Sequence, residues 1–100
     1  MIFTREKLIS RYGSDFDKIY IIDLSDEENK IIKIDSDTFD GLNELCQIVL
    51  DNNLIIDIEL NTFNSLDSLT RLSLGNNKLS SINYKLFKQI FSKNFKSIIS

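Results

Sequence analysis

The chain has 100 residues, of which 42% are hydrophobic and 27% charged, and these values exclude a disordered chain and predict one globular domain. A single cysteine, Cys46, excludes an intrachain disulfide, and no apolar run is long enough to span a membrane. The net charge of −3 is unevenly distributed, because all fifteen acidic residues lie at or before Asp67, together with six Lys and Arg. The other six basic residues follow Asp67 without any acid.

The first predicted element is an amphipathic helix near the N-terminus. Its apolar residues lie within residues 3–16 and are Phe3, Leu8, Ile9, Tyr12 and Phe16. Thr4 and Glu6 stand near a helix start and Gly13 near its end. We expect this helix, within residues 1–18, to form an N-terminal cap over the apolar end of the structure that follows.

Three segments then align without a gap at a period of 24 residues. They read IIDLSDEENKIIKIDSDTFDGLNE (21–44), LCQIVLDNNLIIDIELNTFNSLDS (45–68) and LTRLSLGNNKLSSINYKLFKQIFS (69–92). An internal period of this length predicts a solenoid, in which each unit buries its apolar side against its neighbours. Sequence position then becomes distance along the axis, so the uneven charge predicts an electrically bipolar molecule.

Positions 4 to 6 of each unit alternate inward, outward and inward, as in a short strand. Strands that all run in one direction, each followed by a return path, predict a small parallel sheet. Asp26 is costly at the inward position 6 of the first unit. We therefore prefer a register with a two-residue insertion within SDEEN, in which positions 1, 4 and 6 are Ile19, Ile22 and Leu24. Asp26, Glu27 and Glu28 then lie on a solvated turn.

Two columns of identical residues support this period: Asn29, Asn53 and Asn77 at position 9, and Phe39, Phe63 and Phe87 at position 19. Each Asn comes after a strand, where the chain turns and leaves backbone groups without ladder partners. Its amide can both donate and accept, so a column of amides can satisfy adjacent turns. A solvated turn Asn is the alternative. The apolar positions around the Phe column do not alternate, which predicts an irregular or briefly helical return path.

The conformation of residues 93–100 is left open by the sequence. A fourth strand would place Phe95, Ile98 and Ser100 at positions 1, 4 and 6, and we favour this partial fourth repeat or a C-terminal cap. The alternatives are disorder and a basic amphipathic helix with Lys85, Lys88, Lys93 and Lys96 on its polar side.

The segments LCQIVLDNNLIIDI and LTRLSLGNNKLSSI match the pattern L-x-x-L-x-L-x-x-N-x-L-x-x-I, and TFNSL and LFKQI follow them. Over residues 19–92 the chain therefore resembles the leucine-rich repeat family in its 24-residue form. The resemblance implies an α/β solenoid, a short right-handed coil with its strands on the concave face and the Phe column in the convex half. We expect one domain, residues 1–100, with three repeats over 19–92. The resemblance also implies a non-enzymatic scaffold that binds proteins through its concave face.

Catalysis, cofactors and metals are not expected. The chain has no His, so Cys46 has no partner to activate it and is interpreted as a half-buried filler. Asp35 and Asp37 have calcium-loop spacing, but the Gly and the twelfth-position Glu of that loop are missing. Nucleic-acid binding is not expected either, since the basic residues are few and scattered.

The candidate partner-binding residues are the outward positions of the strands and of the turns after them. They are Asp23, Ser25, Gln47, Val49, Asp51, Asn52, Arg71, Ser73, Gly75 and Asn76. Val49 is expected to be the one exposed apolar point of this face, which offers no aromatic anchor.

Two other functions remain as alternatives. Complementary charges and open ends favour self-association, either end to end or through an edge strand as a homodimer. The segment Lys85–Lys96 favours attachment to an anionic membrane surface. Because no signal peptide or cysteine cluster is visible, a cytoplasmic location is expected, with a piece of a larger secreted protein as the alternative.

Overall fold

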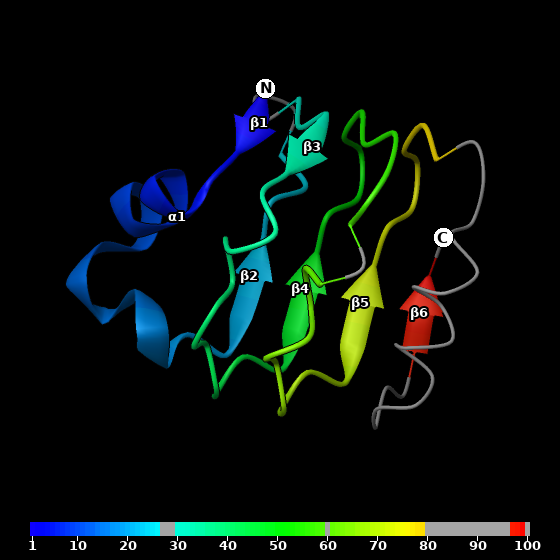
Figure 1. The fold of residues 1–100 in the computed structure, drawn as a ribbon. Coiled ribbons are helices and arrows are strands. Elements are labelled where there is room, and N and C mark those ends of the chain that lie inside the picture. The colour runs from blue at the N-terminus through cyan, green and yellow to red at the C-terminus, as the bar shows by residue number, and fades with distance from the viewer. Residues whose placement is uncertain (27–29, 60, 80–96, 100) are drawn as a thin grey trace.

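A computed structural model of the chain describes residues 1–26, 30–59, 61–79 and 97–99. Its main feature is a parallel sheet of four short strands whose order in space follows their order in the chain (Figure 1). The strands are β2 (Ile21–Asp23), β4 (Gln47–Val49), β5 (Arg71–Ser73) and β6 (Ser97–Ile99). Each strand is thus one step further along the same axis, as stacked repeats require.

The register of these strands confirms the two-residue insertion in the first unit. Ile22 lies opposite Ile48, 26 residues later, whereas Leu72 lies opposite Ile48 after the regular 24. Ile98 lies opposite Leu72, again after 26 residues. This is the position that the fourth-strand interpretation assigns to Ile98, and Ser97–Ile99 are therefore a strand and not part of a helix.

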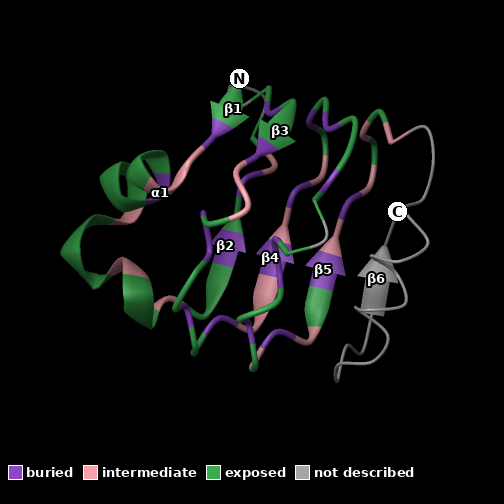
Figure 2. Cartoon of the chain, in the orientation of Figure 1, coloured by how far each residue is buried: buried purple, intermediate pink, exposed green. Residues whose placement is uncertain are grey.

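The core lies between the sheet and the return segments, which pass over one of its faces (Figures 1 and 2). Every second side chain of a strand points into it, as the period of two demands. The buried strand residues are Ile22, Leu24, Ile48, Leu50, Leu72 and Leu74. On the return side, the rings of Phe39 and Phe63 are buried and stack with their centroids 6.1 Å apart. Phe87 lies outside the described residues.

The first return segment differs from the expected irregular path. It contains a short strand, β3 (Lys33–Ile34), which pairs in parallel with β1 (Ile2–Phe3). The expectation was wrong here because the ladder partner comes from the N-terminal segment, which lies outside the repeat. A periodicity argument sees only contacts between one unit and the next.

The expected N-terminal helix is present as α1 (Arg5–Tyr12). The hydroxyl of Thr4 accepts a hydrogen bond from the Lys7 amide at 3.3 Å, and the helix ends at Gly13, whose φ of 80° favours glycine. A 3₁₀ segment, η1 (Gly13–Lys18), leads from there towards β2. Leu8 is the buried residue of α1, and Phe3 belongs to β1 rather than to the helix.

Two members of the Asn column lie in the turns after β4 and β5. The side-chain oxygen of Asn53 accepts from the Ile31 amide at 3.0 Å, and its NH₂ donates to the carbonyl of Leu24 at 2.8 Å. Asn77 repeats this one unit later, accepting from Ile55 at 3.1 Å and donating to Leu50 at 3.0 Å. Each amide thus bridges to the preceding turn. Asn29 lies outside the described residues.

Candidate functional site

The outward side chains of β2, β4 and β5 form two rows across the sheet. One row contains Ile21, Gln47 and Arg71, and the other contains Asp23, Val49 and Ser73. Their neighbours along each strand are buried, so the rows face away from the core. The structure therefore brings the strand members of the predicted contact set together on one face.

The turn members of that set are held by hydrogen bonds within the protein. One oxygen of Asp51 accepts from the Ser73 hydroxyl at 2.6 Å and from the Gly75 amide at 2.9 Å. Asp23 likewise accepts from the amide and the hydroxyl of Ser25, at 2.9 and 2.5 Å. These carboxylates keep their charge on the face while their positions are fixed by neighbouring residues.

Asn52 and Asn76 lie next to each other at the turns that follow β4 and β5. The NH₂ of Asn76 donates to the side-chain oxygen of Asn52 at 3.0 Å. Both backbones are left-handed, with φ of 61° and 60°, a conformation that Asn tolerates better than most residues. These two exposed side chains therefore lie at the edge of the sheet rather than on its strands.

Charge changes along the face from one strand to the next. Asp23 lies on β2, Asp51 follows β4, and Arg71 lies on β5. Asp26, beside the acidic end, forms an ion pair with Arg11 of α1 at 2.8 Å. This hydrogen bond raises the pKa of Arg11. The described part of the face is thus acidic at β2 and basic at β5.

Two exposed apolar residues at the acidic end were not in the predicted set. Ile21 is 54% exposed, and Tyr20, the residue before β2, is 65% exposed. Val49 is only half-buried between its neighbours, so the expectation of one exposed apolar point at Val49 and no nearby aromatic was wrong. The two-residue shift of the first unit supplied the signal, because it moves Ile21 into the outward row with Gln47 and Arg71.

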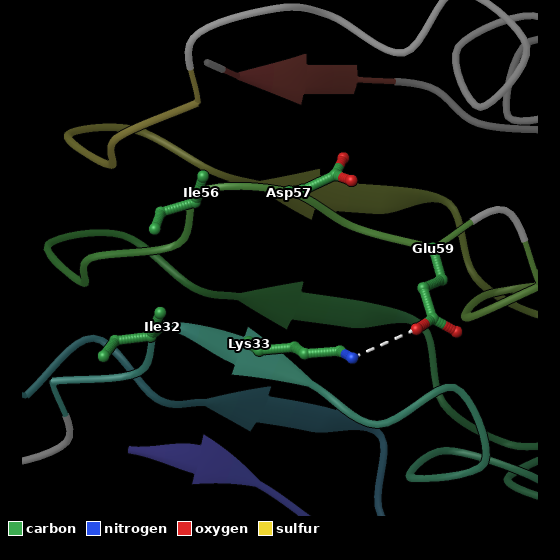
Figure 3. Close-up of a pocket in the computed structure, with 5 residues that line it drawn as sticks. All are labelled: Ile32, Lys33, Ile56, Asp57 and Glu59. Carbon is green, nitrogen blue, oxygen red and sulfur yellow. Dashed lines mark ion pairs between the residues drawn. The ribbon is translucent and has the colours of Figure 1, made fainter.

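A separate hollow lies on the return side of the molecule, away from the outward rows (Figure 3). Its volume is about 290 Å³, and its lining residues are Ile32, Lys33, Ile56, Asp57 and Glu59. The side chains of Ile32 and Ile56 lie at one end, whereas the ammonium of Lys33 reaches 3.3 Å from a carboxylate oxygen of Glu59 (Figure 3). The sequence analysis missed these two isoleucines, which follow the buried position 11 of their units.

The described residues offer little for chemistry. Within ranges 1–26, 30–59 and 61–79, no three His, Cys, Asp or Glu side chains gather as metal ligands do. Cys46 is half-buried, and its thiol contacts the carbonyl of Glu44 at 3.4 Å. Among the helices that the structure describes, none has the length and apolar character needed to cross a bilayer.

Comparison with known families agrees with this repeat architecture. A family model described as leucine rich repeat matches residues 17–79 and, in a second placement, residues 47–90. The chain therefore belongs to the leucine-rich repeat family, whose members have a solenoid-like repeat fold. Domains of this family generally mediate protein–protein interaction and are typically non-enzymatic. Neither the curated proteins nor the solved structures contain a match to the chain.

Proposed function

We propose that this chain is a non-enzymatic module that binds a protein partner through the outward, concave face of its parallel sheet. The observation that carries the proposal is the alignment of outward side chains in two rows across β2, β4 and β5. Family membership supports the same function class. Residues 1–18 would act as the N-terminal cap of the coil, with Leu8 buried against its first unit.

The partner would contact the acidic end of the face first. Tyr20 and Ile21 offer exposed apolar area, and exposed aromatic and aliphatic residues beside charges are typical anchors of protein interfaces. Asp23 and Asp51 would contribute charge complementarity to a basic surface of the partner, and Arg71 would set its orientation. The bonds that fix Asp51 reduce the ordering cost on binding.

A matched pair of variants tests this face. Partner capture from the native source is followed by affinity measurement with Ile21→Asp and Ile56→Asp, two isoleucines with the same exposed fraction of 54% on different faces. We expect Ile21→Asp to weaken binding by about tenfold or more, because a desolvated anchor is lost, while Ile56→Asp stays within about twofold. Equal effects, or a larger effect of Ile56→Asp, would place the partner elsewhere.

Self-association is a second candidate, and the strand order favours it. Because β2, β4, β5 and β6 are adjacent in chain order, the acidic segment up to Asp67 precedes β5 along the axis. Complementary ends could bring copies together head to tail. Sedimentation at about 20 mM and about 500 mM salt tests this, since screening should dissociate such a complex. A monomer at both salt concentrations excludes it. Membrane attachment through Lys85–Lys96 concerns residues outside the described ranges.

A further inference from the structure

A second hollow lies where the turns after the strands pack side by side, at the edge of the sheet. Its volume is about 450 Å³, and it is lined by Lys30, Asn52, Asn53, Leu54, Asn76 and Lys78. It shares no residue with the hollow of Figure 3 and none with the two rows on the strands. All six lining residues come from the turns and the start of the return paths, in the region above β2, β4 and β5 in Figure 1.

The charge of this hollow is positive. Both Lys30 and Lys78 are exposed, and no acidic residue lines the hollow. The ion pairs found among the described residues are Arg11–Asp26 and Lys33–Glu59. Within that part of the chain, therefore, Lys30 and Lys78 have no carboxylate partner, unlike the nearby Lys33. Two unneutralised ammonium groups beside one hollow favour an anionic occupant.

The repeat fixes the arrangement of these two cations. The Leu54 amide donates to the carbonyl of Ile31 at 2.8 Å, and the Lys78 amide donates to that of Ile55 at 3.0 Å. Lys30, Leu54 and Lys78 therefore occupy equivalent places in three successive coils. At about 4.8 Å per coil, the two lysine backbones are about 10 Å apart. Leu54, which is 37% exposed, lies between them and gives the hollow an apolar floor.

The backbone around the hollow does not suit a bare phosphate. The amides of Asn52, Leu54 and Lys78 already donate to the carbonyls of Gly75, Ile31 and Ile55. A phosphate nest needs successive free N–H groups, and these three are used. Lysine ammonium groups and the Asn52 amide remain as side-chain donors. Carboxylates carried on side chains, with an apolar side chain between them, match this order of cation, leucine and cation.

We propose that this hollow is a docking site for an acidic peptide segment of a protein partner, in which one apolar residue lies between two acidic ones. An extended chain advances about 3.3 Å per residue, so acidic residues two or three positions apart come within reach of both flexible lysines. The apolar residue between them packs on Leu54. This site is distinct from the sheet face, and one partner could occupy both.

The test is a titration of the full chain, followed by amide chemical shifts, with an eight-residue peptide that has Glu-Leu-Glu at its centre and Gly and Ser around it. We expect shifts at Asn52, Leu54 and Asn76, and binding about tenfold weaker in the double variant Lys30→Gln/Lys78→Gln. Lys33→Gln removes a nearby exposed lysine of the same charge and should stay within about twofold. Ile21→Asp, on the sheet face, should also bind this peptide as the parent chain does.

Each control can overturn the proposal. Equal weakening by Lys33→Gln would reduce the effect to net charge. Equal binding of a Gln-Leu-Gln peptide would remove the role of the carboxylates, and equal binding of a Glu-Gly-Glu peptide that of Leu54. Displacement of the peptide by an equimolar amount of inorganic phosphate would indicate a general anion site instead. Loss of the sheet-face partner with Ile21→Asp, while the peptide still binds, separates the two proposals.

Discussion

The side chain of Asn53 connects the turn that follows β4 to the turn before it. It is 3% exposed, and it accepts from Ile31 while donating to the carbonyls of Leu24, Leu50 and Asp51. These backbone groups lie where strands end, so they have no ladder partners of their own. A single amide thus solves a problem that each turn of a repeat creates.

Asn53→Ala should lower the free energy of unfolding by about 1–3 kcal/mol, because buried backbone groups lose their partner. Asn53→Asp should cost a similar amount, since a carboxylate keeps the shape and the acceptor but cannot donate to the three carbonyls. Urea denaturation measures both. Asn43→Ala, at an exposed position of a return segment, is the control and should change stability little. An unchanged midpoint for Asn53→Ala would contradict the assigned role.

Left-handed backbone at Asn52 gives a second prediction at this scale. Its φ of 61° strains residues with a Cβ, and Gly is free of that strain. Both Asn52→Gly and Asn52→Ala remove the side-chain bond to Asn76, so the difference between them isolates the backbone. We expect the Ala variant to be less stable than the Gly variant by about 1 kcal/mol. Thermal denaturation of the two variants side by side provides the comparison, and Ala as stable as Gly would refute it.

Each strand of the four-stranded sheet is short, and its stability comes from the side chain that points inward. Ile22, Ile48 and Leu72 lie in one row across neighbouring strands, and all are buried. A core of this kind is closely packed, so the loss of one methylene is not compensated by solvent. The outward rows are free of this constraint, and this is why their residues can vary from Asp to Val to Ser.

Ile48→Val in the central strand should therefore lower the free energy of unfolding by about 0.5–1.5 kcal/mol. The same substitution at Ile32, which is 43% exposed, should have an effect within about 0.5 kcal/mol. Guanidinium denaturation of both variants compares one chemical change at a buried and an exposed site. Similar losses at the two positions would show that intrinsic β-propensity, rather than packing, decides the effect.

The whole molecule is a short array whose first coil is extended by non-repeated structure. α1 buries Leu8 in the same core as Ile22, and β1 adds a strand beside β3. Arg5 donates to the carbonyl of Asp40 at 2.7 Å and lies 5.2 Å from the centre of the Phe16 ring. The N-terminal segment therefore holds both itself and the first return path in place.

Two adjacent residues of α1 test this integration. Leu8→Ala should lower stability by about 2–5 kcal/mol because it leaves a cavity between the helix and the coil. Ile9→Ala, which changes an exposed residue on the same helix, should cost about 1 kcal/mol or less. Circular dichroism followed through thermal unfolding measures both. A helix that frayed independently would give small and equal losses.

Much of this architecture could be predicted from the sequence, and the rest follows from contacts that no repeat encodes. The strand positions, the shifted first register and the place of Ile98 came from alternation and period. The pairing of β1 with β3 did not, because its two strands share no pattern. Within the candidate site, Asp23 and Arg71 could be placed on one face, whereas the tie from Asp51 to Ser73 and Gly75 required coordinates.

The sequence by itself determined the coil, since burial repeats at the same positions in every unit and period is a local property of the chain. Tertiary structure alone decided how much of each outward residue meets solvent and which turns leave hollows between them. Tyr20 and Ile21 are exposed at β2, and Lys30 and Lys78 flank Leu54 across three coils. The physical reason is that exposure and charge pairing depend on side chains from different coils, and these meet only when the units stack.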